Sequence, residues 1–84
     1  MLERDVEAWL VAEVKRRGGI AYKFTSPQRR SVPDRLVLMP GGGVFFVECK
    51  RPGGKPTDAQ VREHEKIRGL GFRVFITDKK EWPA

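Results

Sequence analysis

Two carboxylates and a lysine, Asp34, Glu48 and Lys50, lie on either side of a glycine-rich turn in the middle of the chain. Hard divalent ions such as Mg²⁺ and Mn²⁺ prefer oxygen ligands and keep several waters, so a pair of carboxylates can bind one. An ammonium group beside such an ion can orient an attacking water or stabilise the negative charge that develops on a phosphate. These residue types therefore predict a metal-dependent hydrolytic site.

A β-hairpin is needed to bring the site together, because Asp34 and Glu48 are 14 residues apart in the sequence. Apolar runs predict one strand from Arg35 to Met39 and a second from Val44 to Lys50, and Pro-Gly-Gly-Gly predicts the turn between them. Near-continuous apolar runs are typical of strands that are buried on both faces. We therefore expect helices or a partner subunit to cover the sheet.

The register of this hairpin decides which side chains meet. If Met39 pairs with Val44, the partner of Asp34 is Cys49. Cys49 is one position from Glu48, so the two carboxylates can share an ion, and the Cys49 backbone carbonyl can add a ligand. The lysine follows Glu48 by two residues, which puts both on one face, about 7 Å apart along the strand.

The triplet Glu48-Cys49-Lys50 is a weak signal by itself, because charged residues make up 33% of the chain. A surface ion pair worth ~0–1 kcal/mol explains the bare triplet equally well. The apolar residues before Glu48 and the Pro-Asp at the start of the partner strand favour the catalytic interpretation. An acid and a base at the end of a buried strand require a functional explanation.

The elements around the hairpin follow from apolar spacing and helix-end signals. They are a helix from about Leu2 to Arg17, a strand from Ile20 to Phe24, a basic loop from Thr25 to Val32, a helix from about Asp58 to Leu70, and a strand from Phe72 to Thr77. Thr57 and Gln60 have the spacing of a capping box at the start of the second helix. The predicted order is α-β-β-β-α-β, within one domain of residues 1–84.

Composition narrows the class of partner and compartment. The net charge is +6 and the pI about 10, which favours a polyanionic partner such as nucleic acid over a merely solvated surface. No apolar run is long enough to span a membrane, and the acidic start of the first helix does not resemble a signal peptide. The single cysteine cannot form an intrachain disulfide, so we expect a cytoplasmic protein.

Nearly the whole chain resembles the VRR-NUC domain of the PD-(D/E)XK nuclease superfamily, in the minimal stand-alone form of phages and bacteria. The resemblance is carried by Glu3 with Val6, Val32-Pro33-Asp34-Arg35-Leu36, Phe46-Val47-Glu48-Cys49-Lys50, Lys55, Gln60, His64 and Gly71-Phe72-Arg73-Val74. It implies a restriction-endonuclease-like core with a mixed sheet flanked by helices, Mg²⁺ or Mn²⁺ dependence, and phosphodiester hydrolysis. It also implies a homodimer acting on branched DNA, as in Holliday-junction resolvases.

The resemblance gives each site residue an expected role. It implies that Asp34 and Glu48 are metal ligands, that Lys50 is the catalytic lysine, and that Gln60 borders the site. The acid of the first helix matches Glu3 best, and Glu7, one turn later, is the rival; both are also acids that a helix N-terminus favours. Phosphate contacts are expected from basic residues around the hairpin: Arg29, Arg30, Arg35, Arg51 and Lys55.

Two further residues have more ordinary interpretations. The lone His64 has no second histidine to form a metal site with, so a phosphate contact or helix packing is better supported than ligation. The Cys49 side chain is expected to be a small buried hydrophobe, because no histidine is placed to activate it.

Two function classes remain from the sequence. A metal-dependent, structure-selective endodeoxyribonuclease explains the carboxylates, the lysine and the charge together. A non-catalytic nucleic-acid-binding module explains only the charge and the basic loop, and would bind DNA equally well in the presence of a chelator.

Overall fold

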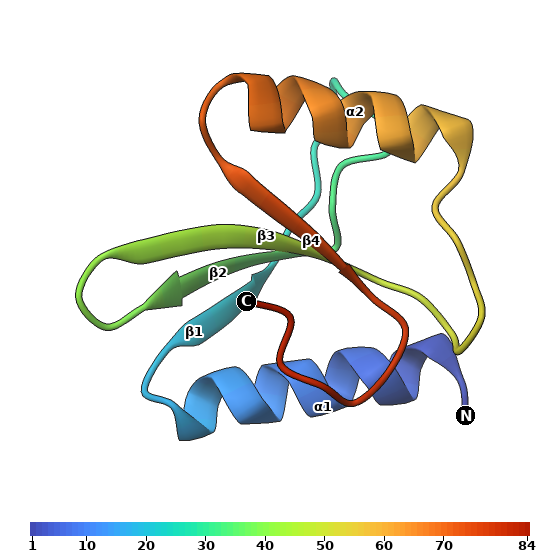
Figure 1. Cartoon of the computed structure of the whole chain (residues 1–84). Helices are drawn as coiled ribbons and strands as arrows, with labels where there is room; N and C mark the ends of the chain where they lie inside the picture. The colour runs from blue at the N-terminus through green and yellow to red at the C-terminus, as the bar shows by residue number, and fades with distance from the viewer.

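The computed structural model describes the whole sequence, Met1–Ala84, and its elements follow the predicted α-β-β-β-α-β order. They are α1 (Glu3–Arg16), β1 (Ile20–Lys23), β2 (Arg35–Met39), β3 (Gly43–Cys49), α2 (Asp58–Gly69) and β4 (Arg73–Thr77). The two helices lie on opposite sides of one four-stranded sheet (Figure 1). The predicted α/β class, with a mixed sheet flanked by helices, is confirmed.

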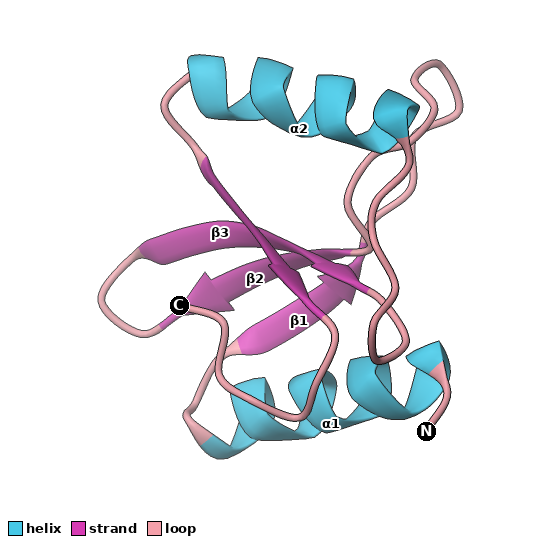
Figure 2. Ribbon diagram, turned by 45° about the vertical axis from the view of Figure 1, so that its right-hand side comes forward, coloured by secondary structure: helices cyan, strands magenta, loops and turns pink.

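The strands are ordered β1-β2-β3-β4, so each strand is the neighbour of the next one along the chain. The pairs β1–β2 and β2–β3 are antiparallel, whereas β3 and β4 are parallel. Parallel neighbours need a crossover connection, and α2 supplies it (Figure 2). The start of β2, the end of β3 and the beginning of α2 are thereby brought to one edge of the fold.

The core lies between α1 and the sheet. Three residues of α1, spaced four apart, are completely buried: Val6, Leu10 and Val14. They pack against inward-facing side chains of β2 and β3: Val37, Phe45, Val47 and Cys49. Each such aliphatic side chain stabilises the fold by ~1.5–3 kcal/mol relative to leaving it exposed. This layer fixes the hairpin strands against α1.

The opposite face of the sheet is only partly covered, because α2 packs beside β4 and leaves much of β1 and β2 open. Four apolar side chains on this face are 37–53% exposed: Ile20, Tyr22, Leu38 and Val44. The pairings of Leu38 with both Ile20 and Val44 place three of them in one row across the sheet. The prediction that both faces of the hairpin strands are buried is therefore wrong within this chain.

The hairpin register differs by one residue from the predicted one. Met39 pairs with Gly43, and Arg35 pairs with Val47. Continuing this ladder by one position sets Asp34 opposite Glu48. The turn closes over fewer residues than predicted because Gly41 and Gly42 both take positive φ angles, of 83° and 88°, which glycine adopts without strain. A one-residue change of register matters here, because it puts both carboxylates on the same face of the sheet.

The C-terminal residues fold back across α1 (Figure 1). Trp82 lies 6.0 Å from Phe45, measured between ring centroids, and the guanidinium of Arg17 stacks on the indole at 3.8 Å. These contacts extend the core beyond the last strand. Neither helix combines the length and apolar character needed to cross a bilayer.

Candidate active site

Glu48 is the most deeply buried acid of the chain, with 2% of its surface exposed near the end of β3. Two side chains reach its Oε2 atom: the Gln60 amide donates a hydrogen bond at 3.2 Å, and the Lys50 ammonium lies at 3.4 Å. Lys50 is itself only 14% exposed. A carboxylate is retained in such a place only when cations and hydrogen-bond donors surround it.

Gln60 fulfils both roles that the sequence left open. Its Oε1 accepts a hydrogen bond from the Thr57 backbone N–H at 2.9 Å, while the Thr57 hydroxyl accepts one from the Gln60 backbone N–H at 3.1 Å. This capping box uses only the oxygen of the amide, so the Nε2 group remains free to donate to Glu48. The start of α2 thus fixes the amide toward the buried acid.

Asp34 immediately precedes β2, and its Oδ2 accepts a hydrogen bond of 2.8 Å from the Cys49 backbone N–H. This bond ties the beginning of β2 to the end of β3, next to Glu48. The second carboxylate oxygen, Oδ1, accepts no hydrogen bond from the protein. Asp34 is therefore held in place while keeping a lone-pair site available.

The surroundings of Glu48 raise its pKa to about 7. Burial is the largest cause, because it disfavours the charged form, and the neighbouring Asp34 carboxylate adds repulsion. The Lys50 ammonium acts in the opposite direction without overcoming the other two. The Glu3 carboxylate adds a further repulsion, the smallest of these causes. Two acids that repel one another in a buried place are poised to bind a cation.

His64 is the residue of this site that was hardest to assign from the sequence. It is completely buried, its two ring nitrogens have no hydrogen-bond partner, and Nε2 lies 3.7 Å from Oε1 of Glu48. That Oε1 atom is also without a partner. Burial and nearby cations lower the pKa of His64, so the ring is neutral near pH 7. Its spacing of four residues from Gln60 was the available signal, because both then point from one face of α2.

Two comparisons bear on these features. The chain is 54% identical over 79 residues to a protein named "Putative nuclease p44" from Acyrthosiphon pisum secondary endosymbiont phage 1, and the match covers 94% of this chain and 85% of that protein. A solved structure described as "VRR_NUC domain" aligns with a TM-score of 0.82 at 36% identity, over 88% of this chain and 81% of its own. The chain belongs to the VRR-NUC family. No protein-family model matches the sequence.

The donor set of this VRR-NUC domain fits a divalent ion. No three side chains among the histidines, cysteines and acids are gathered as a complete metal cage. Mg²⁺ and Mn²⁺ do not require one, since they bind through one or two carboxylates and retain several waters. Glu48 offers an unpartnered buried oxygen, and Asp34 an oxygen that accepts nothing from the protein. Their mutual repulsion is what a cation between them would relieve.

The two acids of α1 are placed differently. Glu7 is engaged by Lys23 at 3.0 Å and by Arg35 at 2.8 Å. Strand alternation puts these cations on the α1 face of the sheet, opposite Glu48. Glu3 is exposed at the first residue of α1, forms no ion pair, and acts on the charge of Glu48. Of the two, Glu3 is the acid that the VRR-NUC fold leaves available to the site.

The basic residues divide into engaged and free cations. Arg35 is bound to Glu7 and to the Ala21 carbonyl, which occupies its guanidinium inside the fold. Arg29 forms two hydrogen bonds of 2.8 Å with Glu63 of α2. The exposed cations without an ion pair near the hairpin are Arg30, Arg51 and Lys55. These three present their full charge to a ligand.

Cys49 takes part in the site through its backbone groups and not through its thiol. The residue is completely buried, and burial raises the pKa of its thiol to about 12, with the Asp34 charge acting in the same direction. A thiol so far from ionisation is a poor nucleophile. Its backbone N–H already orders Asp34, and we keep its carbonyl as a prediction for a metal ligand.

Proposed function

We propose that this VRR-NUC domain is a metal-dependent endodeoxyribonuclease that hydrolyses phosphodiester bonds in branched DNA. The observation that carries the proposal is the arrangement of Glu48. An acid with 2% exposure lies beside a second carboxylate, is contacted by a lysine and a glutamine, and keeps one oxygen without a hydrogen-bond partner. A purely structural ion pair has no reason to leave that oxygen unsatisfied.

In this proposal, Asp34 and Glu48 hold one Mg²⁺ or Mn²⁺ ion, with the Cys49 carbonyl and Glu3 as further ligands. When bound, the ion supplies Lewis-acid stabilisation of charge on the phosphate and a lowered pKa for a coordinated water. Lys50 orients the attacking water and stabilises the charge that develops on the phosphate oxygens. Gln60 keeps the Glu48 carboxylate directed toward the ion.

We propose DNA as the substrate because the protein is positively charged around the hairpin. The net charge of +6 and the free cations Arg30, Arg51 and Lys55 around the hairpin are suited to a polyphosphate backbone. We assign backbone contacts to these three residues and to Arg29 when it is released from Glu63. We leave Arg35 out, because its guanidinium is bound to Glu7. The relative named as a phage nuclease supports action in the bacterial cytoplasm.

A homodimer is the form in which we expect the enzyme to act. The open sheet face with Ile20, Tyr22, Leu38 and Val44 is an apolar surface that an isolated small domain would ordinarily cover. Two copies related by a two-fold axis would cover it and present two sites to the two strands of a junction. This arrangement would explain selectivity for branched over plain duplex DNA.

The test is cleavage of a four-way junction, a flap and a plain duplex in Mg²⁺ or Mn²⁺, with EDTA as the metal-free control. We expect the wild type to cut the junction, and Asp34→Ala and Lys50→Ala to lose at least about 100-fold in rate. Lys80→Ala, which removes an exposed lysine in the C-terminal tail, is the matched control and should cut at the wild-type rate. Absence of cleavage with either ion, or wild-type cleavage by the Lys50 variant, would contradict the proposal. DNA binding that is unaffected by EDTA and never followed by cleavage would instead indicate a binding module.

A further inference from the structure

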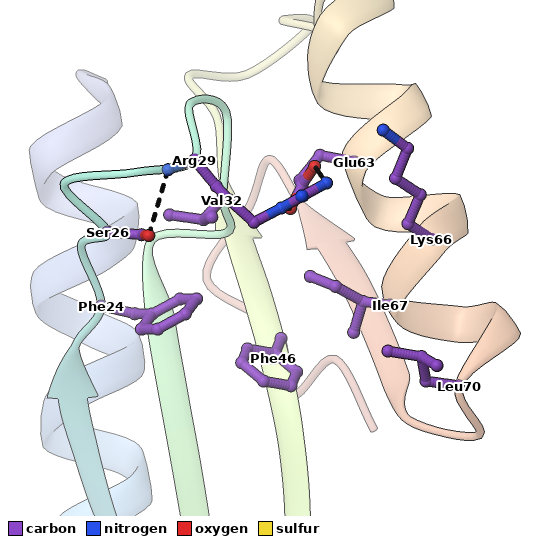
Figure 3. A pocket seen from close by; sticks show the side chains of 9 residues that line it. All are labelled: Phe24, Ser26, Arg29, Val32, Phe46, Glu63, Lys66, Ile67 and Leu70. Atoms are coloured by element: carbon purple, nitrogen blue, oxygen red, sulfur yellow. Dashed lines mark hydrogen bonds and ion pairs between the residues drawn. The ribbon is translucent and has the colours of Figure 1, made fainter.

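A pocket of about 410 Å³ lies beside the candidate active site, between the loop after β1, the open face of β3 and the last turns of α2 (Figure 3). Its volume falls in the range of sites that hold small ligands, ~300–1,000 Å³. Neither the metal-binding residues nor the capping box lines it. The proposed hydrolytic chemistry therefore leaves this pocket without a role.

The walls of the pocket are aromatic and aliphatic. Phe24 and Phe46 form one side, with ring centroids 5.4 Å apart and ring planes tilted by 52°. Ile67 and Leu70 of α2 face them from the other side (Figure 3). Leu70 is 78% exposed, so the pocket is open to solvent along the edge of α2. A flat, apolar ligand can enter there and lie against a ring face.

The rim of the pocket is polar and carries net positive charge. Arg29 crosses it to form two hydrogen bonds with Glu63, and Lys66 of α2 lies beside them (Figure 3). The Ser26 hydroxyl accepts a hydrogen bond from the Arg29 backbone N–H at 3.2 Å, which anchors the loop at this point. Two cations and one acid leave a charge of +1 at the mouth. An occupant with an apolar face and a negative backbone is complementary to this surface.

The pocket is directly connected to the candidate site. Phe46 precedes Glu48 by two residues on the same face of β3, about 7 Å along the strand. The Phe24 backbone N–H donates a hydrogen bond of 2.8 Å to the Asp34 carbonyl. On α2, Glu63 is the immediate neighbour of His64. A nucleotide adjacent to a phosphate at the carboxylates would therefore lie within reach of the pocket.

We propose that this pocket binds an unstacked nucleobase next to the phosphate that is cleaved. The inference rests on the proposed function and names its substrate class: DNA that offers an unpaired base at the cleavage position. The base stacks on Phe24 and Phe46, and its backbone phosphate is bound by Lys66 and by Arg29 once released from Glu63. A base in regular duplex must first be unstacked and unpaired, which costs a few kcal/mol, whereas one at a branch point is already free. Each single chain then contributes to the selectivity for branched DNA, in addition to the paired sites of the proposed dimer.

The test measures binding without requiring cleavage. The fluorescent base analogue 2-aminopurine is placed in an unpaired position of a bulged duplex and, separately, in a fully paired duplex, both in EDTA. Phe24→Leu fills the same space without an aromatic face, and Phe24→Tyr keeps the face and is the matched control. Thermal unfolding of both variants checks that each is folded.

We expect wild type and Phe24→Tyr to bind the bulged DNA with equal affinity and the same change in 2-aminopurine fluorescence. Phe24→Leu should bind it about 10-fold more weakly, as expected from the loss of one aromatic stacking partner, with duplex affinity unchanged. Equal bulge binding by Phe24→Leu and wild type overturns the proposal. So does a change in sedimentation of Phe24→Leu without a change in DNA binding, since the pocket would then hold a second copy of the chain.

The outcome separates this inference from the nuclease proposal. If Phe24→Leu loses bulge binding but the wild type cuts no DNA in Mg²⁺ or Mn²⁺, the base pocket stands and the hydrolytic assignment fails. If the wild type cuts DNA and Phe24→Leu cuts and binds bulged DNA as well as it does, the nuclease proposal stands and the pocket assignment fails.

Discussion

Replacing Glu48 by glutamine should stabilise the metal-free protein at alkaline pH while abolishing its activity. The pKa of Glu48 is raised from 4.5 to about 7, so the folded state holds a proton that the unfolded state has lost between these values. The free energy of unfolding therefore falls as pH rises through this window. At 1.36 kcal/mol for each unit, the Glu48 charge costs up to about 3 kcal/mol above pH 7.

Glutamine has the same shape and carries no charge, so the variant escapes this cost. Lys50 loses its partner in the variant and, being 14% exposed, offsets part of the gain. We expect Glu48→Gln to be about 1–3 kcal/mol more stable than wild type at pH 8, and equal to it at pH 4, where the acid is protonated in both states. For a domain of this size, a gain of 1 kcal/mol corresponds to roughly 4–8 °C in Tm.

The assay is urea unfolding in EDTA at pH 4 and pH 8, followed by tryptophan fluorescence and circular dichroism. Glu81→Gln, which neutralises an exposed acid without an ion pair, is the control and should change the free energy of unfolding by less than about 0.5 kcal/mol. Adding Mg²⁺ at pH 8 should stabilise the wild type but not Glu48→Gln. A Glu48→Gln variant that is less stable than wild type at pH 8, or shifted equally at both pH values, would refute the reasoning.

Three other predictions concern different parts of the molecule. His64→Phe should leave the metal-free fold intact but slow single-turnover cleavage by about 10-fold or more, because the buried carboxylate loses the ring nitrogen beside it. Gly19→Ala should lower the free energy of unfolding by about 1–3 kcal/mol, because its Cβ would lie 2.6 Å from a backbone carbonyl oxygen and from a methionine sulfur. Gly69→Ala, at the end of α2 with open space around it, should raise that free energy by up to about 1 kcal/mol, and urea unfolding distinguishes the two. Sedimentation of Tyr22→Glu should show a monomer where wild type is a dimer, while Ala12→Glu on α1 leaves the dimer intact; a monomeric wild type would contradict the dimer.

Local sequence patterns were sufficient to predict the helices and strands and to choose the candidate residues of the site. Spacing of four in α1, the glycine turn and the capping box of α2 each depend on residues close in sequence, so their structures could be predicted from chemistry and sterics alone. Asp34, Glu48 and Lys50 could be chosen because their residue types and their positions at strand ends already define a chemistry. Their catalytic roles stay a prediction.

Other properties depended on how the elements pack in three dimensions. The hairpin register, which sets Asp34 opposite Glu48, follows from the closing of the turn and the burial of one strand face against α1. The open face of β1 and β2 exists because α2 lies to one side, over β4. The ion pairs of Arg29 with Glu63 and of Arg35 with Glu7, which neutralise two of the expected cations, join residues 34 and 28 positions apart.

The sequence by itself determined which groups could do chemistry, since residue type fixes charge, ligand preference and local backbone geometry. Only the tertiary structure decided the environment of those groups. His64 beside Glu48, the raised pKa of that acid and the apolar pocket at Phe24 and Phe46 all arise from burial and long-range proximity. Electrostatic free energies in a protein depend on solvent exclusion and on the distances between charges, and both are set by the tertiary fold.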